Sequence, residues 1–214
     1  MEINIQKLIG HWTEGYALVL HTVSSTPIRE VKKTVKILVD GKEKEIQLHG
    51  DIIGWDNKYS ELGEHLNKLK YHKERNRITP IAQEAAAFLN GKSEWKIDLI
   101  IPVPPSEAGR FSQPVEELAN AIGRISNIAV DSKTLKKLKS TAPLKGITDP
   151  DSRKEILKDA FDIPSNFLSE KNVLIFDDLY RSGETLNAVC GITKNKGNAK
   201  NIFVLTITKT RTKR

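Results

Sequence analysis

The stretch VLIFDDLYRSGETL, from Val173 to Leu186, decides the fold class and the place of the candidate site. Its first four residues are apolar, as in a strand that is buried on both faces of a parallel sheet. Asp177 and Asp178 follow at the carboxyl end of this strand, and the small residues of 182–185 predict a tight turn into a helix. Ligands of such sheets bind beyond the carboxyl ends of the strands. We therefore expect the functional site at this turn.

Strands and helices alternate over the rest of the chain from about residue 58. Leu62, Leu66 and Leu69 lie at helical spacing, which predicts a helix. The same kind of pattern, with proline and glycine breaks, predicts helices over 60–71, 80–89, 115–122 and 149–160 and after Gly183, and strands over 97–103, 172–176 and 202–208. This alternation predicts an α/β fold with a twisted, mainly parallel sheet and helices on both faces.

The first 55 residues are predicted to be rich in strands, unlike the rest of the chain. Strands are predicted over Tyr16–Thr22, Thr34–Val39 and Glu43–Leu48, and Asp40-Gly41 is a hairpin turn signal between the last two. We therefore expect two parts: a small β-rich N-terminal hood or subdomain over 1–55, and the main α/β domain over 56–214.

Composition favours a globular protein of the cytoplasm. The 214 residues include 38% hydrophobic and 29% charged residues, and no apolar run approaches the about 18 residues that span a bilayer. The start MEINIQKLIGHW lacks a signal-peptide pattern, and one cysteine, Cys190, allows no internal disulfide. We expect a cytoplasmic location and no membrane partner.

The net charge of +7 leaves three interpretations open. A basic chain can bind nucleic acid, attract a small polyanionic substrate, or carry a solvated surface with a basic tail over 208–214. Charge alone does not choose between them.

The turn after Asp177 and Asp178 has the chemistry of a ribose 5-phosphate site. Unpaired N–H groups and the helix dipole favour a phosphate at a helix N-terminus. Adjacent carboxylates can accept hydrogen bonds from sugar hydroxyls. Two alternatives remain open for the aspartates, namely a metal-binding pair of another doubly wound fold and a helix cap.

This run resembles the phosphoribosyl pyrophosphate (PRPP) motif of type I phosphoribosyltransferases, and the chain more closely resembles the competence protein F (ComF) family. The resemblance covers roughly 60–208. It rests also on ELGEHLNKLKY (61–71), IIPVPPSEAGRFSQPVEELANAIGR (100–124) and SRKEILKDAF (152–161), which follow one another in the family's order.

The resemblance implies displacement of pyrophosphate from PRPP by an unknown base or amine, with Mg²⁺ near Asp177 and Asp178, in contact with them either directly or through water. It implies a catalytic role for these two aspartates and Arg110, and a mobile loop in which Lys139 or Lys145 reaches pyrophosphate. A plain surface loop is the alternative for these lysines, and a rigid turn with a solvated Arg110 is the alternative for the pyrophosphate loop. The implied PRPP-binding residues are Asp177, Asp178, Leu179, Tyr180, Arg181, Ser182, Gly183, Glu184 and Thr185, and the implied pyrophosphate loop holds Val103, Pro104, Pro105, Ser106 and Arg110.

A second function remains open beside the enzyme. The family's link to DNA uptake and processing, together with the basic charge, fits a non-catalytic PRPP-sensing or nucleic-acid-associated protein. Nucleic acid is therefore a second partner class, and a homodimer is left open as the assembly. Lys70-Tyr71 is a further candidate of the site, and the five histidines carry no ligand spacing.

The sequence departs from the family's pattern in three respects. Many ComF proteins carry an N-terminal zinc-binding Cys cluster, which this chain lacks. Arg181 stands where the family usually has Thr, and Glu184 adds a carboxylate inside the phosphate loop. We expect Glu184 to point outward, because an inward carboxylate would repel phosphate.

Overall fold

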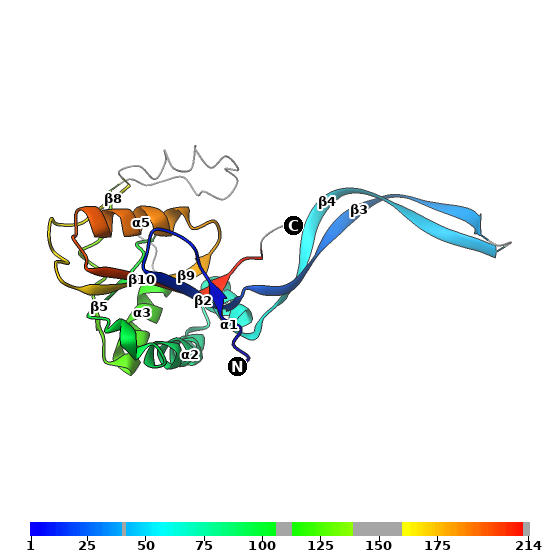
Figure 1. Ribbon diagram of the computed structural model, residues 1–214. Helices are drawn as coiled ribbons and strands as arrows, with labels where there is room; N and C mark the ends of the chain where they lie inside the picture. The colour runs from blue at the N-terminus through cyan, green and yellow to red at the C-terminus, as the bar shows by residue number, and fades with distance from the viewer. Residues whose placement is uncertain (40–41, 106–112, 139–159, 212–214) are drawn as a thin grey trace.

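A six-stranded mixed sheet organises the molecule in the computed structural model, which describes residues 1–39, 42–105, 113–138 and 160–211 (Figure 1). The strand order is β1-β2-β10-β9-β5-β6, and all neighbours are parallel except the edge pair β1–β2. The strands are β1 (Gln6–Lys7), β2 (Glu14–Leu20), β10 (Asn201–Lys209), β9 (Asn172–Tyr180), β5 (Leu99–Pro102) and β6 (Ala129–Val130). The predicted α/β class with a mainly parallel sheet is confirmed.

Helices cover both faces of this sheet (Figure 1). The helices α1 (Glu61–His72), α2 (Ile78–Asn90) and α3 (Pro114–Ser126) pack on one face, in a core with Leu174, Phe176 and Leu205. Helix α5 (Glu184–Asn195) packs on the other face, in a second core with Val173, Ile175 and Val204. Alternate residues of β9 therefore supply the two cores, as expected for a strand with helices on both sides.

Local signals in the sequence fix the start of α1. The Ser60 hydroxyl accepts a hydrogen bond from the Gly63 N–H at 3.1 Å and donates one to the Leu20 carbonyl at 2.6 Å. A β-carbon at Gly63 would lie 2.1 Å from the His21 carbonyl oxygen, so only glycine allows this close approach. Helix α1 is thereby attached to the carboxyl end of β2, and the predicted helix over 60–71 is confirmed.

The strands β3 (Thr22–Val39) and β4 (Lys42–Tyr59) form a separate two-stranded antiparallel ribbon (Figure 1). The predicted strands over 34–39 and 43–48 are confirmed but are much shorter than the observed ones. The predicted strand over 16–22 corresponds to β2, which belongs to the central sheet. The boundary expected between residues 55 and 56 falls inside β4, and the division into two domains stays a prediction.

Smaller elements complete the described chain. They are the short antiparallel pair β7 (Lys136–Lys137) and β8 (Phe161–Asp162) and the 3-10 turns η1 (Arg75–Arg77) and η2 (Ser93–Trp95). The helix predicted over 149–160 lies, apart from its last residue, outside the described residues. Within the described ranges, no helix is both long and apolar enough to cross a membrane.

Candidate functional site

The candidate site lies at the carboxyl edge of the sheet, where β2, β5, β9 and β10 end. Val103 follows β5, and its N–H donates to the Phe176 carbonyl of β9 at 2.8 Å. The first residues of the predicted pyrophosphate loop, Val103 to Pro105, therefore begin beside Asp177. The fold thus brings the two predicted loops together at their bases. Ser106 and Arg110, like Lys139 and Lys145, lie outside the described residues.

Strand β9 continues four residues beyond its predicted end at Phe176, so Asp177 and Asp178 lie within the strand. Successive side chains of a strand point to opposite faces. Asp178 therefore lies on the face that packs on α1, and Asp177 lies on the face that packs on α5. Leu179 and Tyr180 are half-buried and complete the strand.

Asp178 forms an ion pair with Lys70 of α1. The Lys70 Nζ lies 2.7 Å from the Asp178 Oδ2, and Asp178 is buried, at 6% exposure. Burial alone lowers the pKa of Lys70, but the charge of Asp178 and the hydrogen bond to it outweigh that effect and raise the pKa above its ordinary value. A charged lysine therefore neutralises the buried aspartate.

Asp177 has a different environment from its neighbour. Its Oδ1 accepts a hydrogen bond from the Asp178 N–H at 2.8 Å. Burial of the carboxyl group, and then the nearby Asp178 charge, raise the pKa of Asp177 to about 7. Asp177 therefore keeps its proton to a much higher pH than an ordinary aspartate does.

The turn after β9 depends on Gly183. This residue has a φ of +86° and precedes α5, and its carbonyl accepts the Asn187 N–H at 2.8 Å. A β-carbon on Gly183 would lie 2.7 Å from the Tyr180 hydroxyl oxygen. Both the backbone conformation and the close Tyr180 ring thus require glycine. The turn presents the N-terminus of α5 at the same edge as the aspartates.

The remaining motif residues surround this turn. Arg181 and Ser182 are exposed, whereas Glu184 and Thr185 are half-buried. Burial and then the Glu184 charge raise the pKa of Tyr180, which places the Glu184 carboxylate near that ring. The outward orientation expected for Glu184 stays a prediction.

His21 is a residue of this edge that the sequence did not single out. It follows β2, and its Nδ1 lies 3.1 Å from the Thr208 Oγ1 of β10. Burial and then the positive charge of Lys70 lower the pKa of His21. The strand predicted over 16–22 contained His21, but only the strand order reveals that it lies beside β10 and near Lys70.

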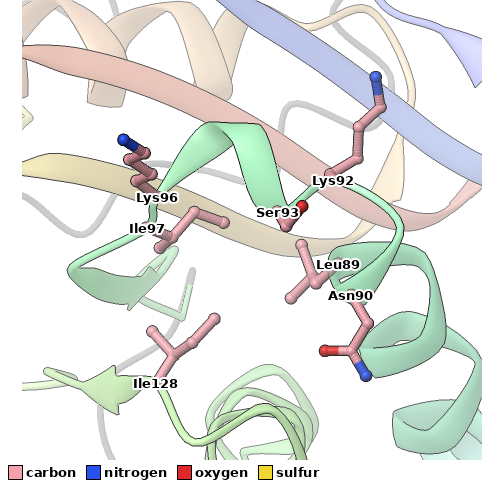
Figure 2. A pocket seen from close by; sticks show the side chains of 7 residues that line it. All are labelled: Leu89, Asn90, Lys92, Ser93, Lys96, Ile97 and Ile128. Carbon is pink, nitrogen blue, oxygen red and sulfur yellow. The ribbon is translucent and has the colours of Figure 1, made fainter.

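A pocket lies away from the aspartates. Figure 2 shows a pocket of about 210 Å³ at the opposite, amino end of β5, with Leu89, Ile97 and Ile128 around it and the charged ends of Lys92 and Lys96 pointing away. None of its lining residues belongs to the motif. Among the described residues, no group of three His, Cys, Asp or Glu side chains is placed to hold a metal ion.

No protein-family model matches the chain, and no curated protein matches it.

Proposed function

We propose that the chain binds PRPP at the carboxyl edge of the sheet and is a phosphoribosyltransferase of the type I class, most similar to the ComF family. One observation carries the proposal. Asp177 and Asp178 lead through the positive-φ Gly183 to the N-terminus of α5. This arrangement puts hydroxyl acceptors one turn away from backbone N–H groups that favour a phosphate.

In this proposal, different residues bind different parts of the ligand. The first turn of α5 receives the 5-phosphate, since the N–H groups and the dipole at a helix N-terminus favour an anion. Asp178 accepts hydrogen bonds from the ribose hydroxyls, and Lys70 holds it in place by the 2.7 Å contact. Lys70 is therefore a positioning residue. The loop that begins at Val103 receives the pyrophosphate.

In the proposed reaction, the bond between the anomeric carbon and pyrophosphate breaks as a bond to the acceptor nitrogen forms. The chain holds ribose and leaving group in position and supplies no nucleophile of its own. Bound Mg²⁺ would neutralise negative charge on the pyrophosphate group of the substrate. The carboxylates of Asp177 and Asp178 suit contact with such a hard cation through water.

A pyrophosphate-release screen tests the enzyme directly. The protein is incubated with PRPP, Mg²⁺ and a panel of nucleobases and amines, and pyrophosphate is measured. We expect release with one acceptor class, and release at least about tenfold slower with Asp178→Asn at a PRPP concentration below saturation. PRPP binding without release by any acceptor would favour the PRPP-sensing alternative over the enzyme.

A further inference from the structure

His21 has a fixed position at the carboxyl edge of the sheet. Its N–H donates to the Lys209 carbonyl of β10 at 2.7 Å, and its carbonyl accepts the Ser60 N–H at 3.1 Å. Its ring meets the Tyr59 ring edge to face, with the centroids 5.3 Å apart and the planes at 78°. The imidazole is therefore held by the sheet, by the start of α1 and by the end of β4. Such support is what a group that acts on a ligand requires.

The hydrogen bonds of Thr208 determine which ring nitrogen of His21 carries the proton. The Thr208 Oγ1 lies 3.4 Å from the Asp178 carbonyl oxygen, which can only accept, so the hydroxyl donates its one proton there. The same Oγ1 lies 3.1 Å from the His21 Nδ1 and therefore accepts from it. In a neutral imidazole, a proton on Nδ1 leaves the lone pair on Nε2. The Nε2 of His21 is thus a hydrogen-bond acceptor.

This Nε2 is available to a ligand. Within the described residues no group forms a hydrogen bond with it, and it is not sealed from solvent. Burial and then the positive charge of Lys70 lower the pKa of His21, and together they outweigh the opposite effect of Asp178. The ring is therefore uncharged near neutral pH, and its lone pair is free beside residues of the candidate site.

The strand order places His21 on the side of the site that faces away from the pyrophosphate loop. Along this edge the order is β2-β10-β9-β5, so Asp178 of β9 lies between the loop after β5 and His21 after β2 (Figure 1). Adjacent strands lie about 4.8 Å apart, so β2 is about 10 Å from β9. A nucleophile that displaces pyrophosphate approaches the anomeric carbon from the side opposite the leaving group. The acceptor is therefore expected on the side of His21.

We propose that His21 is a catalytic residue for the acceptor, whose N–H it binds through Nε2 and whose proton it takes. This inference rests on the proposed phosphoribosyl transfer. The acceptor nitrogen bonds the anomeric carbon with its lone pair, while the bond from that carbon to pyrophosphate breaks and its electron pair leaves with pyrophosphate. The nitrogen then loses its proton to the His21 Nε2. The imidazolium that results returns this proton to water after the product has left.

Two substitutions of His21 separate proton transfer from binding. The probe is the acceptor that gives pyrophosphate release in the panel of nucleobases and amines. His21→Gln keeps an oxygen that can accept the N–H of the acceptor but cannot take its proton, so kcat should fall about a hundredfold with KM for the acceptor within about threefold. His21→Asn is too short to keep this contact, so KM should also rise about tenfold. Both variants should bind PRPP with Mg²⁺ as the wild type does.

His65 of α1 offers a matched control. It is also half-buried, and burial also lowers its pKa. The charges that act on it come from Arg77 and from three residues of α1, none of which belongs to the motif. His65→Asn should therefore leave both kcat and KM unchanged. Circular dichroism verifies that all variants are folded, and a thermal-shift titration measures PRPP binding by each of them.

Heteronuclear NMR of the imidazole nitrogens tests the tautomer in the free protein, without any ligand. The signals of His21 are assigned by their loss in His21→Gln. We expect a proton on Nδ1 and a lone pair on Nε2 at neutral pH. A proton on Nε2 would overturn the role of His21 as a proton acceptor, whatever the protein binds.

The kinetic outcomes separate this inference from the proposed function. A wild type that releases pyrophosphate, with His21 variants that keep its kcat, would overturn the role of His21 and leave the transfer reaction in place. A loss that His65→Asn shares would overturn it too, because the effect would then be on the fold. If PRPP binds but no acceptor gives release, the PRPP-sensing alternative holds and the role of His21 fails together with the enzyme.

Discussion

The Lys70–Asp178 ion pair is the contact at the residue scale on which the proposed site depends. Removing one partner of a buried pair leaves an uncompensated charge. Since Lys70 keeps 28% exposure, we expect Lys70→Met to lower the free energy of unfolding by about 2 kcal/mol, less than for a fully buried pair. It should also weaken PRPP binding. Denaturant unfolding and calorimetry measure the two effects.

Lys68 offers a matched control on the same helix. It pairs with Glu64 at 2.7 Å on the surface, with the two side chains 35% and 55% exposed. Lys68→Met should therefore change the free energy of unfolding by at most about 0.5 kcal/mol and leave PRPP affinity unchanged. Equal effects of the two substitutions on affinity would remove Lys70 from the site.

The raised pKa of Asp177 predicts a pH dependence of stability. The folded protein holds this proton up to about pH 7, whereas the unfolded chain, with a pKa near 3.8, has already lost it. The Asp177 contribution to stability is therefore present at low pH and is lost as pH rises through that interval. Asp177→Asn cannot ionise, and its amide oxygen can keep the hydrogen bond to the Asp178 N–H.

The melting temperature of Asp177→Asn relative to wild type should consequently rise between pH 5 and pH 8. Thermal unfolding at several pH values in this range measures the difference. A constant difference would show that Asp177 titrates at its ordinary pKa in the folded protein.

Two substitutions separate the ribose contacts from the phosphate contacts. Asp178→Asn removes a charged acceptor, so PRPP affinity should fall about ten- to a hundredfold while inorganic phosphate still binds. Gly183→Val forces a branched side chain into a φ of +86° and against Tyr180, so both ligands should be lost. Calorimetry on folded variants measures both ligands. If both variants keep the PRPP affinity of the wild type, the motif is only a structural turn.

At the scale of elements, the sequence predicts those helices and strands whose apolar residues recur at regular spacing. Helix α1, the strands β9 and β10, and the turn at Gly183 follow from apolar spacing and small residues. The last four residues of β9 were not predicted, because the charged residues Asp177 and Asp178 end the apolar run. The strand nevertheless stays paired with β10 beyond them. The full length of the β3–β4 ribbon was missed because β3 and β4 mix charged and apolar residues without a strict period of two.

The sequence indicated Lys70 as a candidate of the site, but neither its contact with Asp178 nor the proximity of His21 could be predicted. His21 follows β2, whereas Lys70 and Asp178 come from α1 and β9, and only the order β2-β10-β9 brings them to one edge. No spacing in the sequence encodes a strand order. The turn at Gly183 and the two aspartates before it could thus be predicted from the motif, whereas the pairing of Asp178 with Lys70 could not.

The charge distribution belongs to the scale of the whole molecule. Residues 22–59 hold seven Lys or Arg and six Asp or Glu, so the rest of the chain carries +6 of the net +7, which suits attraction of a polyanionic small substrate. We therefore expect no DNA or RNA to be retained in gel shifts at about 50 mM salt, where phosphate contacts are strong. Retention that weakens steeply as salt rises would support the nucleic-acid-associated alternative. A variant truncated before Lys209 would then show whether the basic tail is responsible.

Binding of PRPP by the whole protein is the central claim, and a thermal-shift titration of the wild type with PRPP and Mg²⁺ tests it most directly. A ligand at 100 times its dissociation constant stabilises the fold by about 2.7 kcal/mol. We predict that this stabilisation gives a saturable rise in melting temperature. The rise should be greater than the rise with inorganic pyrophosphate and Mg²⁺ at the same concentration. An unchanged melting temperature at millimolar PRPP would contradict the account.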